Sequence, residues 1–380
     1  MQSLLFKTIG GFGLRESHGR SSVERMALQT HVSSAQRLWL FSRRADFWLA
    51  CGGAPVGLLA AMLLIQLHGD RELDAVDFVL SEFHLGATYG AIIQRRLWRD
   101  RRVDVLLIPL IILALTYALS LSGQAVLLTS IAMYAAVWHR GRQSLGVARY
   151  YQRAAGGPVS PAHNILFRGA IYLPMLAATL AYTHLAPGSY EGSPYFALDS
   201  GAEITSLIGF AAVCWVIAYF VFTLLQTHNG RLNSADRTRG LLVHPGESWV
   251  VLAHAIAFGS AYALGASNAS FVLVLAVHHE VQYLYFTYAM ASRPAASRAV
   301  TPSTIDVSVN NLGSTASQHA AGAPRTQRQS AASFLLWPVA GFVGAVVGGW
   351  LQLKWLAPLG LGGLFCHYWL DGRIWIRRPS

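Results

Sequence analysis

Long apolar runs alternate with short polar segments along most of the chain. A helix that crosses a bilayer needs roughly 20 mainly apolar residues, and ten runs meet or approach this length. They cover approximately residues 47–67, 77–94, 104–122, 125–139, 165–186, 204–227, 248–266, 269–290, 333–352 and 355–371. The fourth and tenth runs are short, and we expect both to continue as helix beyond the hydrocarbon. The pattern predicts an all-α fold, a polytopic transmembrane bundle of about ten helices.

The arginines predict how this bundle is oriented. They gather in every second connection and in both terminal segments, for example in QRRLWRDRR after the second run and in HRGRQSLGVAR after the fourth. The connections between them are acidic or neutral, apart from Lys354. Because arginine and lysine concentrate in cytoplasmic loops, we expect both termini to be cytoplasmic, in a multi-pass protein of the cell (inner) membrane.

Polar stretches divide the chain into four segments. Residues 1–46 are predicted to form a cytoplasmic N-terminal arm that is partly disordered, followed by membrane helices 1–8 at 47–290. Residues 291–332 are rich in Ser, Ala, Pro and Thr and lack apolar periodicity, which is typical of a disordered linker. Residues 333–380 would hold helices 9–10 and a basic C-terminus.

Composition favours a membrane protein and disfavours other classes. Of the 380 residues, 53% are hydrophobic and 12% are charged, whereas about 25% of a soluble domain is charged. A net charge of +11 would suggest nucleic-acid binding in a soluble protein. Here the arginines follow the loops, so we expect no nucleic-acid partner. The three cysteines lie in apolar runs without CxxC spacing, which argues against a zinc knuckle or a disulfide framework.

Histidines and carboxylates interrupt several runs, mostly at mid-depth or in the predicted cytoplasmic half. Such side chains are costly in hydrocarbon, so they usually face the bundle interior and pair with one another. The segments are SEFHLGATYG with Glu82 and His84, WHRGRQSLGVARYY with His139, Arg142 and Gln143, the helix around His254, AVHHEVQYLYF with His278, His279, Glu280, Gln282 and Tyr283, and FCHYWLDGR with His367 and Asp371. One polar cluster between the helices would satisfy these groups together.

Several imidazoles with a few carboxylates suit iron, zinc or copper. His84, His139, His279 and His367 are the predicted metal ligands. His278 is the alternative to His279, because adjacent residues point about 100° apart on a helix. Glu82, Glu280 and Asp371 would orient ligands or move protons. Arg142, Gln143, Gln282 and Tyr283 would position a lipophilic substrate or a lipid headgroup.

Structural roles compete with these assignments. His254 would serve equally well as an interhelical hydrogen-bonding residue. His139 would also suit contact with lipid phosphate near the interface, and Arg142 with Gln143 would suit a headgroup or a loop contact. His367 and Asp371, which are four residues apart, would also form an ion pair at a helix end.

The segments HLGATYG, WHRGRQSLGVARYY, AVHHEVQYLYF and HYWLDGRIWIRRP resemble motifs of a poorly characterised group of bacterial polytopic membrane proteins. More distantly, the arrangement resembles the Brp/Blh-type membrane β-carotene dioxygenases, over residues 47–290 and 333–378. The resemblance implies iron held by histidines from several helices, with His84, His139, His278 or His279, and His367 at the matching positions. The long linker and the ten predicted spans depart from that pattern. The HxxxH and HxxHH boxes of membrane desaturases are absent.

The leading hypothesis is a membrane non-haem iron oxygenase or oxidoreductase, with Fe(II) as cofactor and a lipophilic substrate that arrives from the bilayer. A proton-coupled transporter is the first alternative, in which GAPVG in the first helix and LGLGG in the tenth would mark helix breaks. A membrane protein with bis-histidine haem is the second alternative, and haem is the less favoured cofactor.

Overall fold

The computed structural model describes residues 39–65, 71–94, 96–155, 160–185, 189–190, 193–198, 200–232, 243–264, 271–292, 336, 339, 343, 346 and 357–374. Within these residues the chain is almost entirely helical, as the sequence predicts. A single antiparallel pair joins β1 (Ser189–Tyr190) to β2 (Ser193–Pro194). Most of the predicted N-terminal arm, the predicted linker and most of the ninth predicted helix lie outside the described residues.

The helices follow the predicted apolar runs. Their bounds are α2 (Arg43–Ala45), the π-helical η1 (Asp46–Ala50), α3 (Gly53–Ile65), α4 (Arg71–Gln94), α5 (Leu97–Asp100), the π-helical η2 (Val103–Leu107), α6 (Ile108–Leu121), α7 (Ala125–Ala154), α8 (Pro161–Leu185), α9 (Ala202–Leu232), α10 (Pro245–Gly259), the π-helical η4 (Ser260–Leu264), α11 (Val272–Ser292) and α14 (Ala357–Ile374). The short fourth run does continue as helix, because α7 extends to Ala154.

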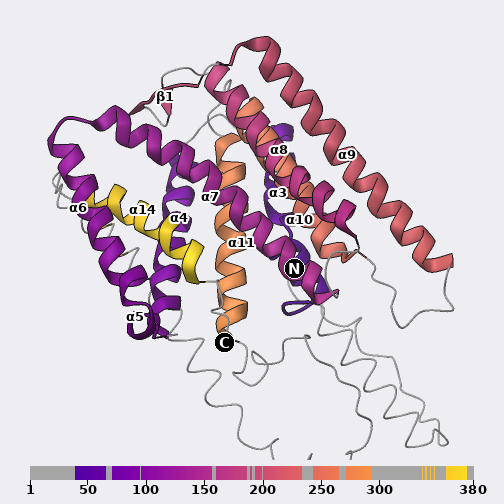
Figure 1. Ribbon diagram of the computed structural model, residues 1–380, viewed down its shortest axis with the longest axis horizontal. Helices are drawn as coiled ribbons and strands as arrows, with labels where there is room; N and C mark the ends of the chain where they lie inside the picture. Colours follow the sequence, from indigo (N-terminus) through magenta and orange to yellow (C-terminus); the bar gives the residue numbers. More distant parts are fainter. Residues whose placement is uncertain are drawn as a thin grey trace, which may run out of the picture.

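Among the described residues, three segments are long and apolar enough to cross a membrane, namely Val103–Leu121, Pro161–Leu185 and Ala202–His228. The bent pair Arg43–Ala50 and Gly53–Leu64 would make a fourth span. The protein is therefore a membrane protein, while the count of ten spans and the cytoplasmic termini stay predictions. Figure 1 shows α6 and α9 at opposite sides, with α4, α7 and α11 between them. Large apolar side chains such as Leu207, Phe210 and Leu110 remain exposed on α9 and α6, as expected for helices that face lipid.

The first helix is broken at Cys51 and Gly52, where its two parts meet at 57°. Gly52 has φ +87°, a left-handed conformation that glycine adopts without steric cost. A side chain there would overlap Ala253 and approach the His278 ring. The break lies directly before the GAPVG segment, whereas LGLGG lies inside the helix α14.

A buried carboxylate anchors the start of the first helix. Asp46 accepts hydrogen bonds from the backbone N–H groups of Leu40 and Phe41. The Tyr151 and Tyr285 hydroxyls also donate to it, at 2.9 and 2.6 Å. Because it is fully buried, this carboxylate needs such donors. Asp46 thus ties the chain before α3 to α7 and α11.

His244 caps the N-terminus of α10 beside this anchor. Its Nδ1 accepts from the Gly246 N–H at 2.9 Å, and its ring stacks on Tyr151. Burial lowers the pKa of His244 to about 4, with the charge of Asp46 acting in the opposite direction. The ring is therefore neutral near pH 7, as an imidazole that accepts at Nδ1 must be.

A second buried polar group joins α8, α9 and α10. His163 Nε2 lies 3.0 Å from Glu247 Oε1, and the Tyr219 hydroxyl donates to the same oxygen at 3.1 Å. All three side chains are almost completely buried. Since leaving a buried polar group without its partner costs free energy, we assign this group to the packing of the three helices.

Candidate metal centre

Four histidines from four helices meet inside the bundle. His84 of α4, His139 of α7, His279 of α11 and His367 of α14 are all buried, with at most 7% of each residue exposed. Each offers one nitrogen, and these four atoms lie within 4.8 Å of one another. Residues up to 283 positions apart in the chain therefore form one group, the His cluster.

The shortest contacts in the His cluster run through His367. Its Nε2 lies 2.7 Å from Nε2 of His84 and 3.2 Å from Nε2 of His139. The His279 ring completes the group, with its centroid 4.6 Å from that of His84 and 4.9 Å from that of His139. The rings cross one another at steep angles instead of stacking. Their nitrogens thus approach a common point from different directions.

A polar side chain follows each of these histidines four residues later in its helix. Residues four apart lie on one face of a helix, so Thr88 follows His84, Gln143 follows His139, Tyr283 follows His279 and Asp371 follows His367. Four of these side chains, Thr88, Tyr283, Asp371 and His367, form a connected hydrogen-bond network on one side of the His cluster. Gln143 instead bonds the backbone of α11.

The hydrogen-bond network favours the tautomer of His367 that has its proton on Nδ1. The Thr88 hydroxyl donates to Asp371 Oδ1 at 3.2 Å, and the Tyr283 hydroxyl donates to the same oxygen. Because the Thr88 proton then points to Asp371, we assign the Thr88 oxygen as the acceptor from His367 Nδ1, which lies 2.8 Å away. A neutral imidazole has one N–H, so His367 Nε2 presents a lone pair to the His cluster. Lone pairs at these separations require a proton or a cation between them.

The separations in the His cluster fit a single metal ion. A metal–imidazole bond of about 2.1 Å places neighbouring ligand atoms roughly 3.0–3.4 Å apart and opposite ones roughly 4.2 Å apart. The observed range, from 2.7 Å up to 4.8 Å, brackets these values. Asp371 Oδ2 lies 3.6 Å from His139 Nε2 and 3.8 Å from His367 Nε2. This carboxyl group lies beside the imidazoles, and Arg140 places a positive charge nearby.

The adjacent histidines of α11 have different surroundings. His279 belongs to the His cluster, whereas His278 lies against Gly52 and has its Nε2 3.5 Å from the Ser144 hydroxyl. His254 is also outside the cluster, and its Nε2 lies 2.9 Å from the Ile171 carbonyl oxygen. The structure thus places His279, and not His278, among the possible ligands.

Of the three carboxylates predicted to assist, Asp371 is in the hydrogen-bond network. Glu280 accepts from the Ser81 hydroxyl and so links α11 to α4 beside the His cluster. Glu82 is two residues from His84, which places the two side chains on opposite faces of α4, and it is partly exposed.

Of the four residues predicted to position substrate, Arg142 is exposed and the other three bond to protein groups. Arg142 is exposed, with its guanidinium 5.9 Å from the Trp138 ring. The Gln143 amide donates to the His279 carbonyl at 2.7 Å and to Gln282 Oε1 at 3.3 Å. Gln282 in turn donates to the Ala50 carbonyl at 2.7 Å. Together with Tyr283, which donates to Asp371, the two glutamines contact protein groups that hold the His cluster in place.

Thr88 and Ser81 were not predicted as site residues, because hydroxyl residues are common in membrane helices and do not stand out in the sequence. A signal for Thr88 does exist, since it follows His84 at the same spacing that joins His367 to Asp371. Ser81 lies one turn before His84 and, in the structure, beside Glu280.

Comparisons with protein-family models, with curated proteins and with solved structures gave no significant match to this chain. The following proposal therefore depends on the geometry of the described residues.

Proposed function

We propose that this protein is a membrane-bound non-haem metal oxygenase or oxidoreductase that acts on a lipophilic substrate. His84, His139, His279 and His367 would hold one metal ion, for which iron is the best candidate. The observation that carries the proposal is the convergence of four buried imidazoles from four helices within 4.8 Å. Burying four such polar rings is costly, and a shared cation offsets that cost for all of them.

The ligand set narrows the choice of metal. Four imidazoles suit iron, copper, nickel or zinc and disfavour calcium or magnesium, which prefer oxygen. Iron and copper would add redox chemistry that zinc lacks. A bis-histidine haem fits the geometry poorly, because the ring centroids of His84 and His139 lie only 4.4–4.9 Å from those of His279 and His367, which is too close for a macrocycle between them.

An iron ion bound here would supply dioxygen activation or electron transfer. The remaining work falls to the residues beside the His cluster. Thr88 keeps the proton of His367 on Nδ1, which leaves Nε2 free to bind a metal. Asp371 lies between the Tyr283 hydroxyl and the imidazoles, so its carboxylate can accept a proton from Tyr283 and return it. The surrounding apolar helices exclude water, which suits a substrate dissolved in the bilayer.

Elemental analysis of the detergent-purified protein tests the metal. We expect about one iron per chain in the wild type, and its loss in His84→Gln and His279→Gln. His278→Gln is a matched control, since this neighbour of His279 is equally buried but outside the His cluster, and it should keep the metal. A folded wild type that binds no metal after supplementation would overturn the proposal, as would equal loss in the His278 variant.

Incubation of wild-type membranes with isotopically labelled dioxygen tests the reaction. Label should appear in lipid-soluble compounds extracted from these membranes, and His279→Gln should abolish it while His278→Gln retains it. Stoichiometric iron without labelled products and without oxidation of any lipophilic compound would leave a metal protein, but not the oxygenase or oxidoreductase proposed.

A further inference from the structure

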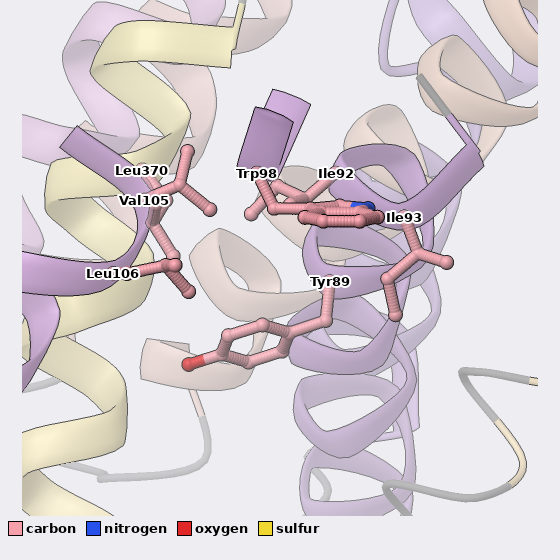
Figure 2. Close-up of a pocket in the computed structure, with 7 residues that line it drawn as sticks. All are labelled: Tyr89, Ile92, Ile93, Trp98, Val105, Leu106 and Leu370. Carbon is pink, nitrogen blue, oxygen red and sulfur yellow. The ribbon is translucent and has the colours of Figure 1, made fainter. Parts of the chain in front are cut away.

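An apolar groove lies between residues of α4, α5, η2 and α14, and none of its lining residues belongs to the His cluster. Its volume is about 400 Å³, within the range of roughly 300–1,000 Å³ for small-molecule sites. Figure 2 shows Val105, Leu106 and Leu370 on one side, facing Tyr89 and Trp98 on the other. The lining is almost wholly hydrocarbon and aromatic, so the groove suits an apolar chain.

The groove lies at one end of a candidate membrane span. That span begins at Val103, and the groove residues Val105 and Leu106 are in its first turns. Trp98 precedes it and is 39% exposed. Tryptophan is enriched where hydrocarbon meets the headgroup layer. The groove therefore opens at the level where a phospholipid headgroup joins its acyl chains.

Arginines are dense in the segments beside the groove-lining residues. Arg99 lies over the Trp98 ring, with its guanidinium carbon 4.8 Å from the ring centroid. Arg373 packs over Trp369 at 4.4 Å and lies 3.9 Å from Asp104. The Arg101 guanidinium donates to the Arg373 carbonyl, which joins α5 to the end of α14. The segments that flank the lining residues in the chain carry Arg96, Arg99, Arg101, Arg102 and Arg373, against the acidic Asp100 and Asp104.

The backbone takes an unusual conformation at Arg96, just before the groove residue Trp98. Arg96 has φ +52°, the one positive φ of a non-glycine residue among the described residues. A non-glycine residue in this region is strained and persists where the surrounding structure requires it. The turn at Arg96 separates α4 from α5, whose Trp98 lines the groove.

We infer that this groove binds an anionic phospholipid, with one acyl chain between α4, η2 and α14 and the phosphate at the arginines. Basic sites beside transmembrane helices attract anionic headgroups, and the excess of arginine over aspartate supplies that attraction. A zwitterionic lipid of the same chain length would gain the apolar contacts but less of the charge interaction. The site is separate from the His cluster and does not depend on the proposed function.

Photocrosslinking of the purified full-length protein tests the groove. The probes are phosphatidylglycerol and phosphatidylcholine that carry the same diazirine acyl chain, and mass spectrometry locates the labelled peptides. Phosphatidylglycerol should label residues 89–106 several-fold more than phosphatidylcholine does. The same labelling should persist in His84→Gln, so that failure of the metal proposal does not affect this result.

Paired variants separate the two parts of the site. Arg99→Gln with Arg102→Gln should remove most of the preference for phosphatidylglycerol, whereas Arg43→Gln with Arg44→Gln, an equal loss of charge elsewhere, should not. Leu106→Trp should fill the groove and reduce labelling by both lipids, and Leu110→Trp, on the exposed face of α6, should not. Equal labelling by the two lipids, equal effects of the control variants, or labelling spread evenly along the α6 and α9 surfaces would overturn the inference.

Discussion

Thr88 joins the His cluster to the hydrogen-bond network beside it, although it is not one of the proposed metal ligands. Its hydroxyl contacts His367 Nδ1, Tyr283 and Asp371 at 2.6–3.2 Å. Partners of this kind fix the tautomer and orientation of a ligating imidazole, and their loss typically costs roughly 10–100-fold in metal affinity. The structure thus assigns a supporting role to the Thr88 hydroxyl, which contacts His367 but is not one of the proposed metal ligands.

Thr88→Val keeps the shape of the side chain and removes its hydroxyl. We expect metal affinity to fall by about 10–100-fold, as measured by competition with a chelator, while the protein stays folded. Thr116→Val is the matched control, because this buried hydroxyl bonds only the Ile112 carbonyl of its own helix. Unchanged affinity in the Thr88 variant would show that the network does not position His367.

At the scale of single elements, the break at Gly52 decides where α3 begins and what His278 contacts. A side chain at Gly52 would be held at a left-handed φ, which costs about 1–2 kcal/mol. It would also overlap Ala253 and press on His278, and overpacking usually adds about 1–3 kcal/mol. The glycine therefore allows the first helix to pack closely against α10 and α11.

Gly52→Ala should lower the midpoint of thermal unfolding in detergent by several degrees. Gly209→Ala is the control, since Gly209 lies within α9 with open space around it. There alanine should leave stability unchanged or raise it by about 0.5–1 kcal/mol. Similar midpoints for the two variants would mean that the break at Gly52 is not a requirement of the packing.

The sequence predicted the His cluster better than it predicted its surroundings. Ionisable groups in an apolar bundle must share partners, and this requirement was enough to predict that His84, His139 and His367 lie together. The sequence preferred His279 and kept His278 as the alternative, and the rotation of α11 in the structure places His279 in the cluster. Gln143 and Gln282 were predicted to face a substrate, yet they bond the His279 and Ala50 carbonyls. Those backbone partners depend on the helix break and on packing, which residue types alone do not reveal.

For the whole molecule, the arginine pattern predicts which end of the bundle faces the cytoplasm. Ser122, in the turn between α6 and α7, and Arg153, near the far end of α7, are both exposed. In a background without native cysteines, Ser122→Cys should react with a membrane-impermeant thiol reagent applied from the periplasm. Arg153→Cys should react only after the membrane is opened. The reverse pattern would invert the orientation and leave the His cluster itself unchanged.

The central claim is that four imidazoles from four helices bind one metal ion. X-ray absorption spectroscopy of the metal-loaded protein measures this directly. The account predicts a first shell dominated by nitrogen at about 2.0–2.2 Å, with the outer-shell scattering of about four imidazoles and no sulfur. His279→Gln should lose one imidazole or the metal. A first shell with fewer than three imidazoles, or one containing sulfur, would contradict the account.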